Sequence, residues 1–310
     1  ACRPVLGNKV DGIAGKLIDL IAVFALLAGT ATTFSLATPL LAGAISSVTG
    51  IPQSTGLTLV ILVIVCAIYT FSVYFGMKGV QLSAATCTWL FFGLLAYVFF
   101  FGGQTRFIIE EGITALGNLT QNFIGLATWT DSLRTSSFPQ TWTIFYWAYW
   151  MVWCVAVPFF IGSISKGRTL RQVILGGYVF GLSGTFTSFI IMGNYGLGLQ
   201  MHGKLDVLST YTADGNLYHA ILDILGQLPL SKAVLVLLVL CMITFYSTSF
   251  DSITMVASTY TYKKLQSDEE PHRNVKLFWA IFLILLPLAL IFSENSMTNL
   301  QTVSIIAAFP

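Results

Sequence analysis

Long apolar runs, separated by short polar segments, dominate the chain. A run of about 17–25 apolar residues is long enough to cross a bilayer as a helix. Seven such runs lie at 17–36, 56–76, 82–102, 142–165, 170–198, 231–261 and 277–293. An eighth begins near residue 298. The pattern predicts an all-α polytopic membrane protein with a single transmembrane domain over residues 1–310.

Small and helix-breaking residues predict local features within these runs. Pro39 follows the first run, and it predicts a kink or break where nearby hydroxyls satisfy the freed backbone groups. The run at 170–198 contains four glycines, whose small surfaces favour close helix contact. These are Gly176, Gly177, Gly181 and Gly184. Two semi-apolar stretches, 107–126 and 217–228, are predicted as short helices along the membrane interface.

Composition supports a membrane protein, because 55% of the residues are apolar and only 9% are charged. Soluble domains carry about 25% charged residues. The net charge of +2 gives no indication of a nucleic-acid partner. The five cysteines show no CxxC spacing, so they predict buried apolar positions rather than disulfides or metal ligands. Both ends of the sequence resemble cut ends, and we expect a fragment truncated at both ends.

The distribution of Lys and Arg predicts the orientation, since cytoplasmic loops carry an excess of both. With the N-terminus inside, eleven lie on the inner side: Arg3, Lys9, Lys16, Lys78, Lys166, Arg168, Arg171, Lys263, Lys264, Arg273 and Lys276. Four lie outside: Arg106, Arg134, Lys204 and Lys232. Segments 104–140 and 199–230 are therefore expected outside. The basic loop 164–171 is interpreted as fixing topology and contacting anionic lipid, and the mixed-charge segment 263–276 as a solvated connector.

An aromatic cluster stands out between residues 141 and 154. Its rings are Trp142, Tyr146, Trp147, Tyr149, Trp150 and Trp153. At about 100° per residue these six rings share one helix face of roughly 160°. Such a face attracts a permanent cation through the ring quadrupoles without a counter-carboxylate. The alternatives are an interfacial aromatic belt or ordinary helix packing.

One acidic residue, Asp251, lies deep within an apolar run, and an intramembrane carboxylate indicates function by default. Thr248, Ser249 and the carbonyl of Phe245 could supply hard oxygen ligands to a sodium ion. The alternative is that these hydroxyls bond back to their own helix. The sequence therefore leaves both a sodium site and a structural role open, with Asp251 in support.

Two adjacent segments carry a family resemblance. Trp142-Thr-Ile-Phe-Tyr-Trp-Ala-Tyr-Trp150, followed by Ile164-Ser-Lys-Gly-Arg-Thr-Leu-Arg171, resembles the signature region of the betaine/carnitine/choline transporters. Further matches are Arg3-Pro-Val-Leu-Gly7, Gly15-Lys-Leu-Ile-Asp19, Lys78-Gly79, Ser249-Phe-Asp-Ser252 and Asn299-Leu-Gln-Thr-Val-Ser304. The resemblance covers essentially the whole chain. It implies an inverted-repeat (LeuT-like) secondary transporter core, of which this chain would hold the fifth to eleventh helices and the start of the twelfth.

The resemblance also implies a substrate site on the aromatic segment. Trp147, Tyr149, Trp150 and Trp153 would lie on the helix that presents the family's tryptophan box, with Tyr146 in support. Position 149 departs from the family pattern, because Tyr stands where the signature has Trp. The other half of the box belongs to the family's fourth helix, which this chain does not include.

The resemblance gives mixed signals on ion coupling. The sodium-independent carnitine/γ-butyrobetaine exchangers place an arginine where Cys87 stands, and a methionine where Val157 stands. Phe245, Thr248 and Ser249 match the sodium ligands of the symporters. Of the two threonines in the symporters' second sodium site, only Thr30 remains. We therefore expect sodium-coupled uptake through one retained site, with sodium-independent exchange as the alternative.

These observations together predict a carrier of quaternary-ammonium zwitterions such as glycine betaine, carnitine or choline. We expect it in the bacterial inner membrane, without a cofactor beyond sodium and, by resemblance, as a homotrimer. A non-transporting osmosensor or binding protein is the alternative from another class. The sequence shows no paired acids or nucleophile–base set of an enzyme, and no charged rings of a channel.

Overall fold

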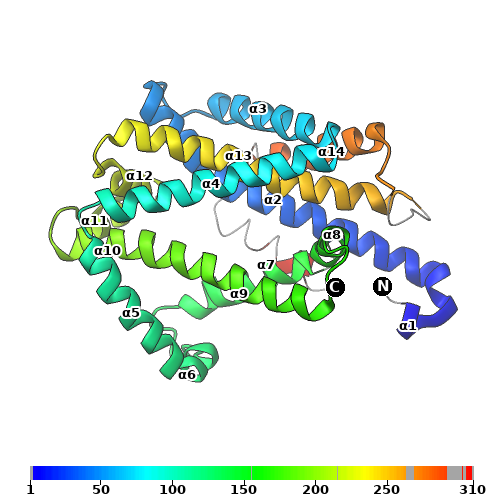
Figure 1. The fold of residues 1–310 in the computed structure, drawn as a ribbon, viewed down its shortest axis with the longest axis horizontal. Coiled ribbons are helices and arrows are strands. Elements are labelled where there is room, and N and C mark those ends of the chain that lie inside the picture. The colour runs from blue at the N-terminus through cyan, green and yellow to red at the C-terminus, as the bar shows by residue number, and fades with distance from the viewer. Residues whose placement is uncertain are drawn as a thin grey trace.

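The computed structural model describes residues 3–154, 156–214, 216–262, 269–291, 302 and 305–308, and these residues are mostly helical (Figure 1). The first half contains α1 (Arg3–Leu6), the 3-10 turn η1 (Gly7–Asp11), α2 (Ile13–Thr49), α3 (Thr55–Tyr74), α4 (Met77–Phe101), α5 (Thr105–Gln121) and α6 (Phe123–Thr128). The π-helical turn η2 (Pro139–Thr143) leads into α7 (Ile144–Trp153) and α8 (Ala156–Ile164).

The second half begins with α9 (Leu170–Ser188), which continues through the π-helical turn η3 (Phe189–Gly193) into α10 (Asn194–Met201). The remaining helices are α11 (Val207–Asp214), α12 (Leu217–Gly226), α13 (Ser231–Tyr260) and α14 (Arg273–Ile291). Among the described residues, five helices are long and apolar enough to cross a membrane. They cover Ile13–Thr49, Thr55–Tyr74, Gly79–Phe101, Leu170–Met201 and Ser231–Tyr260.

Helix α13 lies at the centre of a bundle, where it packs against α2, α3, α4 and α14. Its core side chains Tyr246 and Phe250 stack on Phe34 of α2, with ring centroids 5.2 and 3.8 Å apart. Tyr69 of α3 joins this cluster, and its hydroxyl donates to the carbonyl of Ala280 in α14 at 2.5 Å. Four helices therefore meet on one aromatic core. Figure 1 shows α9 below this bundle, with α7 and α8 nearby.

Two of the predicted spans differ from the structure. Helix α2 continues without a break through Pro39, and the Thr38 hydroxyl donates to the carbonyl of Phe34 at 2.5 Å. The predicted span 142–165 is instead two helices, because α7 ends at Trp153 and α8 begins at Ala156. Pro158 explains the second difference: it has no N–H to bond the carbonyl of residue 154, and its ring obstructs that position. The start of the eighth predicted span lies largely outside the described residues.

The four glycines in α9, predicted to allow close helix contact, have no neighbouring helix among the described residues, so their packing role stays a prediction. A methyl group at Gly176, Gly177, Gly181 or Gly184 would meet nothing within 4 Å. No described residue of α9 is buried. The helix instead joins the fold through η3, which packs against α4 and α5.

The predicted solvated connector 263–276 is described from residue 269 onward, and most of this part is exposed, with Lys276 as an exception. Lys276 is only 3% exposed, and its ammonium group pairs with Glu270 at 3.0 Å. A methyl group added at Gly76 would lie 2.5 Å from the Glu270 carboxylate, so the carboxylate also packs closely against this glycine. The short helices predicted at 107–126 and 217–228 are present as α5, α6 and α12.

Candidate functional site

A loop stabilised by hydrogen bonds leads into the aromatic segment. The carboxylate of Asp131 accepts hydrogen bonds from the backbone and side chains of Thr135 and Ser136, and from the backbone of Ser137, over 2.8–3.1 Å. These donors favour the ionised form and hold the pKa of Asp131 well below its usual range. The Gln140 side chain donates to the carbonyl of Thr130 at 2.7 Å. The start of η2 is thereby tied to the loop.

Helix α7 approaches α2 closely at a glycine. A methyl group at Gly29 would lie 2.6 Å from Val152 and 3.0 Å from the Trp153 ring. Val152 is 1% exposed and packs with Ala25 and Ala28 of α2. The small residues of α2 therefore determine how closely α7 approaches α2, a role that the sequence analysis did not predict.

A hydrogen bond fixes the Tyr149 ring against α2. The hydroxyls of Tyr149 and Thr33 are 2.7 Å apart. Because Thr33 donates its own proton to the carbonyl of Gly29 at 2.9 Å, it accepts the proton of Tyr149. The ring of Tyr149 also meets the rings of Trp150 and Trp153 edge-on, at centroid distances of 6.5 and 6.1 Å. Sequence reasoning did not identify Thr33 as the partner of Tyr149.

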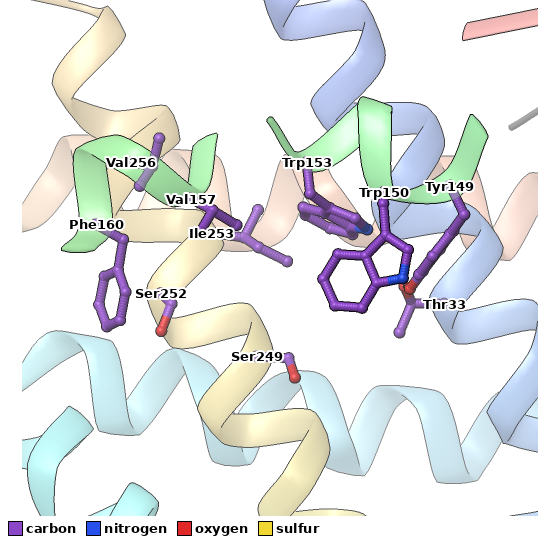
Figure 2. A pocket seen from close by; sticks show the side chains of 10 residues that line it. All are labelled: Thr33, Tyr149, Trp150, Trp153, Val157, Phe160, Ser249, Ser252, Ile253 and Val256. Atoms are coloured by element: carbon purple, nitrogen blue, oxygen red, sulfur yellow. The ribbon is translucent and has the colours of Figure 1, made fainter. Parts of the chain in front are cut away.

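These aromatic residues line a cavity of about 250 Å³ between α7, α8, α2 and α13 (Figure 2). Its lining residues are Thr33, Tyr149, Trp150, Trp153, Val157, Phe160, Ser249, Ser252, Ile253 and Val256. In Figure 2 the side chains of Tyr149, Trp150 and Trp153 project from α7 on one side, with Thr33 beside Tyr149 and Ser249 on the facing helix. The volume is slightly below the roughly 300–1,000 Å³ of sites for drug-sized ligands, so the cavity suits a smaller molecule.

The other predicted aromatic residues lie outside this cavity. Trp147 is 72% exposed and Tyr146 is 50% exposed. Tyr146 stacks on Trp142, with ring centroids 6.1 Å apart. The single aromatic face predicted from the sequence is therefore divided, because Tyr149, Trp150 and Trp153 line the cavity and the other three rings do not.

The predicted sodium residues on α13 face different neighbours. Ser249 lines the cavity, whereas the Thr248 hydroxyl donates to the carbonyl of Thr244 at 2.9 Å and lies 3.3 Å from the Ser83 hydroxyl of α4. Phe245 packs edge-on against Phe91 of α4, at a centroid distance of 5.3 Å.

The remaining two candidates are buried away from the cavity. Thr30 is fully buried, and its hydroxyl donates to the carbonyl of Leu26 at 2.7 Å. Asp251 is also fully buried, and it accepts a hydrogen bond from Ser72 of α3 at 2.7 Å. The bonds of Thr30 and Thr248 to their own helices match the structural alternative. Each hydroxyl oxygen still retains a lone pair for a further contact.

The cavity has the chemistry of a neutral receptor for a cation. No charged side chain lines it; its polar groups are hydroxyls on α2, α7 and α13 and the indole N–H groups of Trp150 and Trp153. Aromatic faces attract a cation most strongly where water is excluded. The described residues contain no group of three His, Cys, Asp or Glu side chains that could hold a metal ion. The fold and the site therefore define the class of this protein: a helical membrane protein with an aromatic-walled cavity.

Comparison with known proteins identifies the family. The model of the betaine/carnitine/choline family transporters matches residues 1–310, and the chain belongs to this family. A carnitine transporter of Acinetobacter baumannii is 29% identical, with 99% of this chain and 56% of the relative covered. A probable glycine betaine transporter of Desulfitobacterium hafniense is 30% identical, with 100% and 61% covered. The glycine betaine transporter OpuD of Bacillus subtilis is 32% identical, with 99% and 59% covered. The chain therefore spans 56–61% of the length of these relatives.

Proposed function

We propose that this chain is part of a secondary carrier for trimethylammonium-type zwitterions, such as glycine betaine or carnitine. The observation that carries the proposal is the cavity wall of Tyr149, Trp150 and Trp153, which faces hydroxyl groups and no charge. The trimethylammonium end would rest on the aromatic rings. The Ser249 hydroxyl is a suitable donor to the carboxylate end, whereas the Ser252 hydroxyl already donates to the carbonyl of Thr248 at 3.0 Å. The names of the relatives support the substrate class.

The proposal includes sodium-coupled uptake. Ser249 lines the cavity and Thr248 precedes it directly, so an ion held by these two residues would lie next to the substrate. Sodium accepts hard oxygen ligands, which these hydroxyls and the Phe245 carbonyl supply. Sodium bound there would favour the state that accepts substrate. We further propose the bacterial plasma membrane as its location, with the N-terminus of the chain on the cytoplasmic side, and a homotrimeric assembly by family resemblance.

Counterflow in proteoliposomes tests the function directly. The full-length protein is reconstituted, loaded with unlabelled substrate, and offered labelled glycine betaine or carnitine with and without sodium. We expect labelled substrate to accumulate only when sodium is present. Binding without flux would instead identify an osmosensor or binding protein. Equal flux with and without sodium would identify an exchanger.

A variant of Thr248 tests the ion site within the same assay. Thr248→Ala removes one oxygen ligand, so the sodium concentration for half-maximal transport should rise by about tenfold, which corresponds to roughly 1.4 kcal/mol. The matched control is Thr244→Ala, one turn earlier, whose hydroxyl donates to the carbonyls of Leu240 and Cys241. If both variants require the same sodium concentration as the parent, Thr248 is not a ligand.

A further inference from the structure

A buried polar stripe runs along the face of α13 opposite the cavity. It consists of Ser247, Asp251 and Thr254, which are 3%, 0% and 0% exposed. These residues are separated by four and three positions, so they share one helix face. At about 100° per residue, this face lies roughly 180° from the cavity-lining residues Ser249, Ser252, Ile253 and Val256.

The carboxyl group of Asp251 has fewer partners than a buried charge needs. Ser72 donates to its Oδ2 at 2.7 Å, and the Ser247 hydroxyl also interacts with the carboxyl group. Its Oδ1 has no hydrogen-bond partner among the described residues, and neither has the Thr254 hydroxyl. Buried polar atoms normally have partners, and each exception requires an explanation. Here two exceptions occur on adjacent turns of one helix face.

No positive charge among the described residues balances Asp251. Helix α3, which packs over the stripe, contains no Asp, Glu, Lys, Arg or His. Its facing Tyr69 donates to Ala280 and so cannot donate to the carboxylate. On α14, Lys276 pairs with Glu270, and the guanidinium of Arg273 lies over the Tyr74 ring, 5.1 Å from its centroid.

Helices α2 and α4 carry few charges. On α2 these are Lys16 and Asp19 near the helix start, and Asp19 interacts with Tyr260 near the end of α13. On α4 the charged residue is Lys78, in the first turn. An ionised carboxylate in this environment is costly unless a cation compensates it.

We propose that Asp251, Ser72 and Thr254 form a binding site for a monovalent hard cation of the sodium type, separate from Thr248 and Ser249, with Ser247 bonded to the Asp251 carboxyl group. The ligand chemistry carries the choice, because carboxylate and hydroxyl oxygens select hard cations over transition metals. One carboxylate balances one positive charge, whereas a divalent ion would leave excess charge in an apolar interior. The site connects α3 to α13, so the ion would hold these two helices together. The proposal goes beyond the cavity and does not require that the protein transports anything.

Equilibrium binding of radiolabelled sodium to the purified full-length protein tests the site without transport. We expect Asp251→Asn to remove this binding component, because the neutral amide supplies no charge. Thr254→Val, which keeps the shape of the side chain, should weaken sodium binding by about tenfold, or roughly 1.4 kcal/mol. The matched control is Ser258→Ala, one turn further along the stripe. The Ser258 hydroxyl already donates to the carbonyl of Thr254 at 2.6 Å, and the variant should bind sodium like the parent.

The variants separate this site from the proposed function. Thr248→Ala should leave the Asp251 component of sodium binding intact, even if it changes transport. Sodium should also raise the thermal unfolding temperature of the parent protein but not that of Asp251→Asn. If Asp251→Asn fails to fold, the tenfold loss in Thr254→Val still tests the proposal. Parent-like sodium binding in both Asp251→Asn and Thr254→Val would overturn it, and the carboxyl group would then be protonated or structural.

Discussion

At the residue scale, the cavity assigns different roles to aromatic side chains that the sequence treats alike. Trp150 lines the cavity and is 65% exposed, whereas Trp147, three residues earlier, is 72% exposed and lies outside the cavity. Their spacing of three residues places them on neighbouring parts of one helix face. Packing of α7 against α2 and α13 decides which of these rings meets the cavity.

Replacing these two tryptophans separately gives the first prediction. Trp150→Ala should weaken substrate binding by about 1 kcal/mol, or roughly fivefold, because a partly exposed cation–π contact is lost. Trp147→Ala should bind substrate like the parent. Both affinities can be measured by titration of the full-length protein with glycine betaine or carnitine. Equal losses in the two variants would restore the undivided aromatic face predicted from the sequence.

Asp131 provides a prediction on pH at the same scale. Its lowered folded-state pKa means that ionised Asp131 stabilises the loop at pH values above the ordinary Asp pKa of about 3.9. This stabilisation is lost as the pH falls through the lowered pKa. Asp131→Asn should therefore raise hydrogen exchange at the amides of residues 135–137 at neutral pH. Wild type should show the same increase only in acid, after correction for the intrinsic exchange rate.

A second aspartate serves as the control for Asp131. Asp206 accepts bonds from Ser209 and Gln200 in a different loop, and these donors also lower its pKa. Asp206→Asn should leave exchange at residues 135–137 unchanged. No change in the exchange of Asp131→Asn would show that the loop does not depend on its carboxylate.

At the element scale, close contact between α2 and α7 positions the cavity wall. Gly29 lies against Val152 and Trp153, so the distance between the two helices depends on a missing side chain. Protein interiors are close-packed and accommodate an added methyl group only by shifting neighbours. A change on α2 that touches no substrate can therefore move a cavity residue.

Gly29→Ala should reduce both stability and substrate affinity. Overpacking costs about 1–3 kcal/mol, and the displaced Trp153 ring would no longer match the cavity. Thermal unfolding in detergent and substrate titration measure the two effects. Gly181→Ala is the matched control, since its added methyl group meets nothing within 4 Å. A parent-like Gly29→Ala would mean that α7 yields without affecting the site.

The elements also show what a sequence can and cannot predict. The long apolar runs predicted α3, α4 and α13 closely, because hydrocarbon length alone determines a span. The break between α7 and α8 was missed, since an apolar run contains no charge to mark it and only Pro158 indicates it. The sequence also did not show that Thr248 and Asp251 face different helices. Thr248 contacts α4 and Asp251 contacts α3, and the packing of these helices around α13 decides which side chain meets which.

At the scale of the whole molecule, family membership and helical architecture follow from the sequence, but the assembly of the site does not. The aromatic segment identified the helix that carries the cavity. The partners on α2, Thr33 and Gly29, come from more than 110 residues earlier in the chain. Contacts over such separations depend on tertiary packing, which a local pattern does not contain.

The orientation of the whole chain gives a further prediction. In a full-length variant without native cysteines, a cysteine at Thr130 should react with an impermeant thiol reagent added outside intact cells. A cysteine at Ser165 should react only after permeabilisation, because the excess of Lys and Arg keeps that side in the cytoplasm. The reverse labelling pattern would invert the membrane orientation inferred here.

The π-helical turns η2 and η3 make the effect of a deletion depend on where it falls. A π turn bonds residue i to i+5 and so contains one residue more than an α turn. Loss of one residue from 139–143 would therefore allow an α turn to form there, with α7 close to its present register. Loss of one residue from the regular helix that follows, between 144 and 148, would instead rotate the residues beyond it by about 100°. Tyr149, Trp150 and Trp153 would then turn away from α2 together, so a single-codon deletion in α7 should be far more damaging than one in η2.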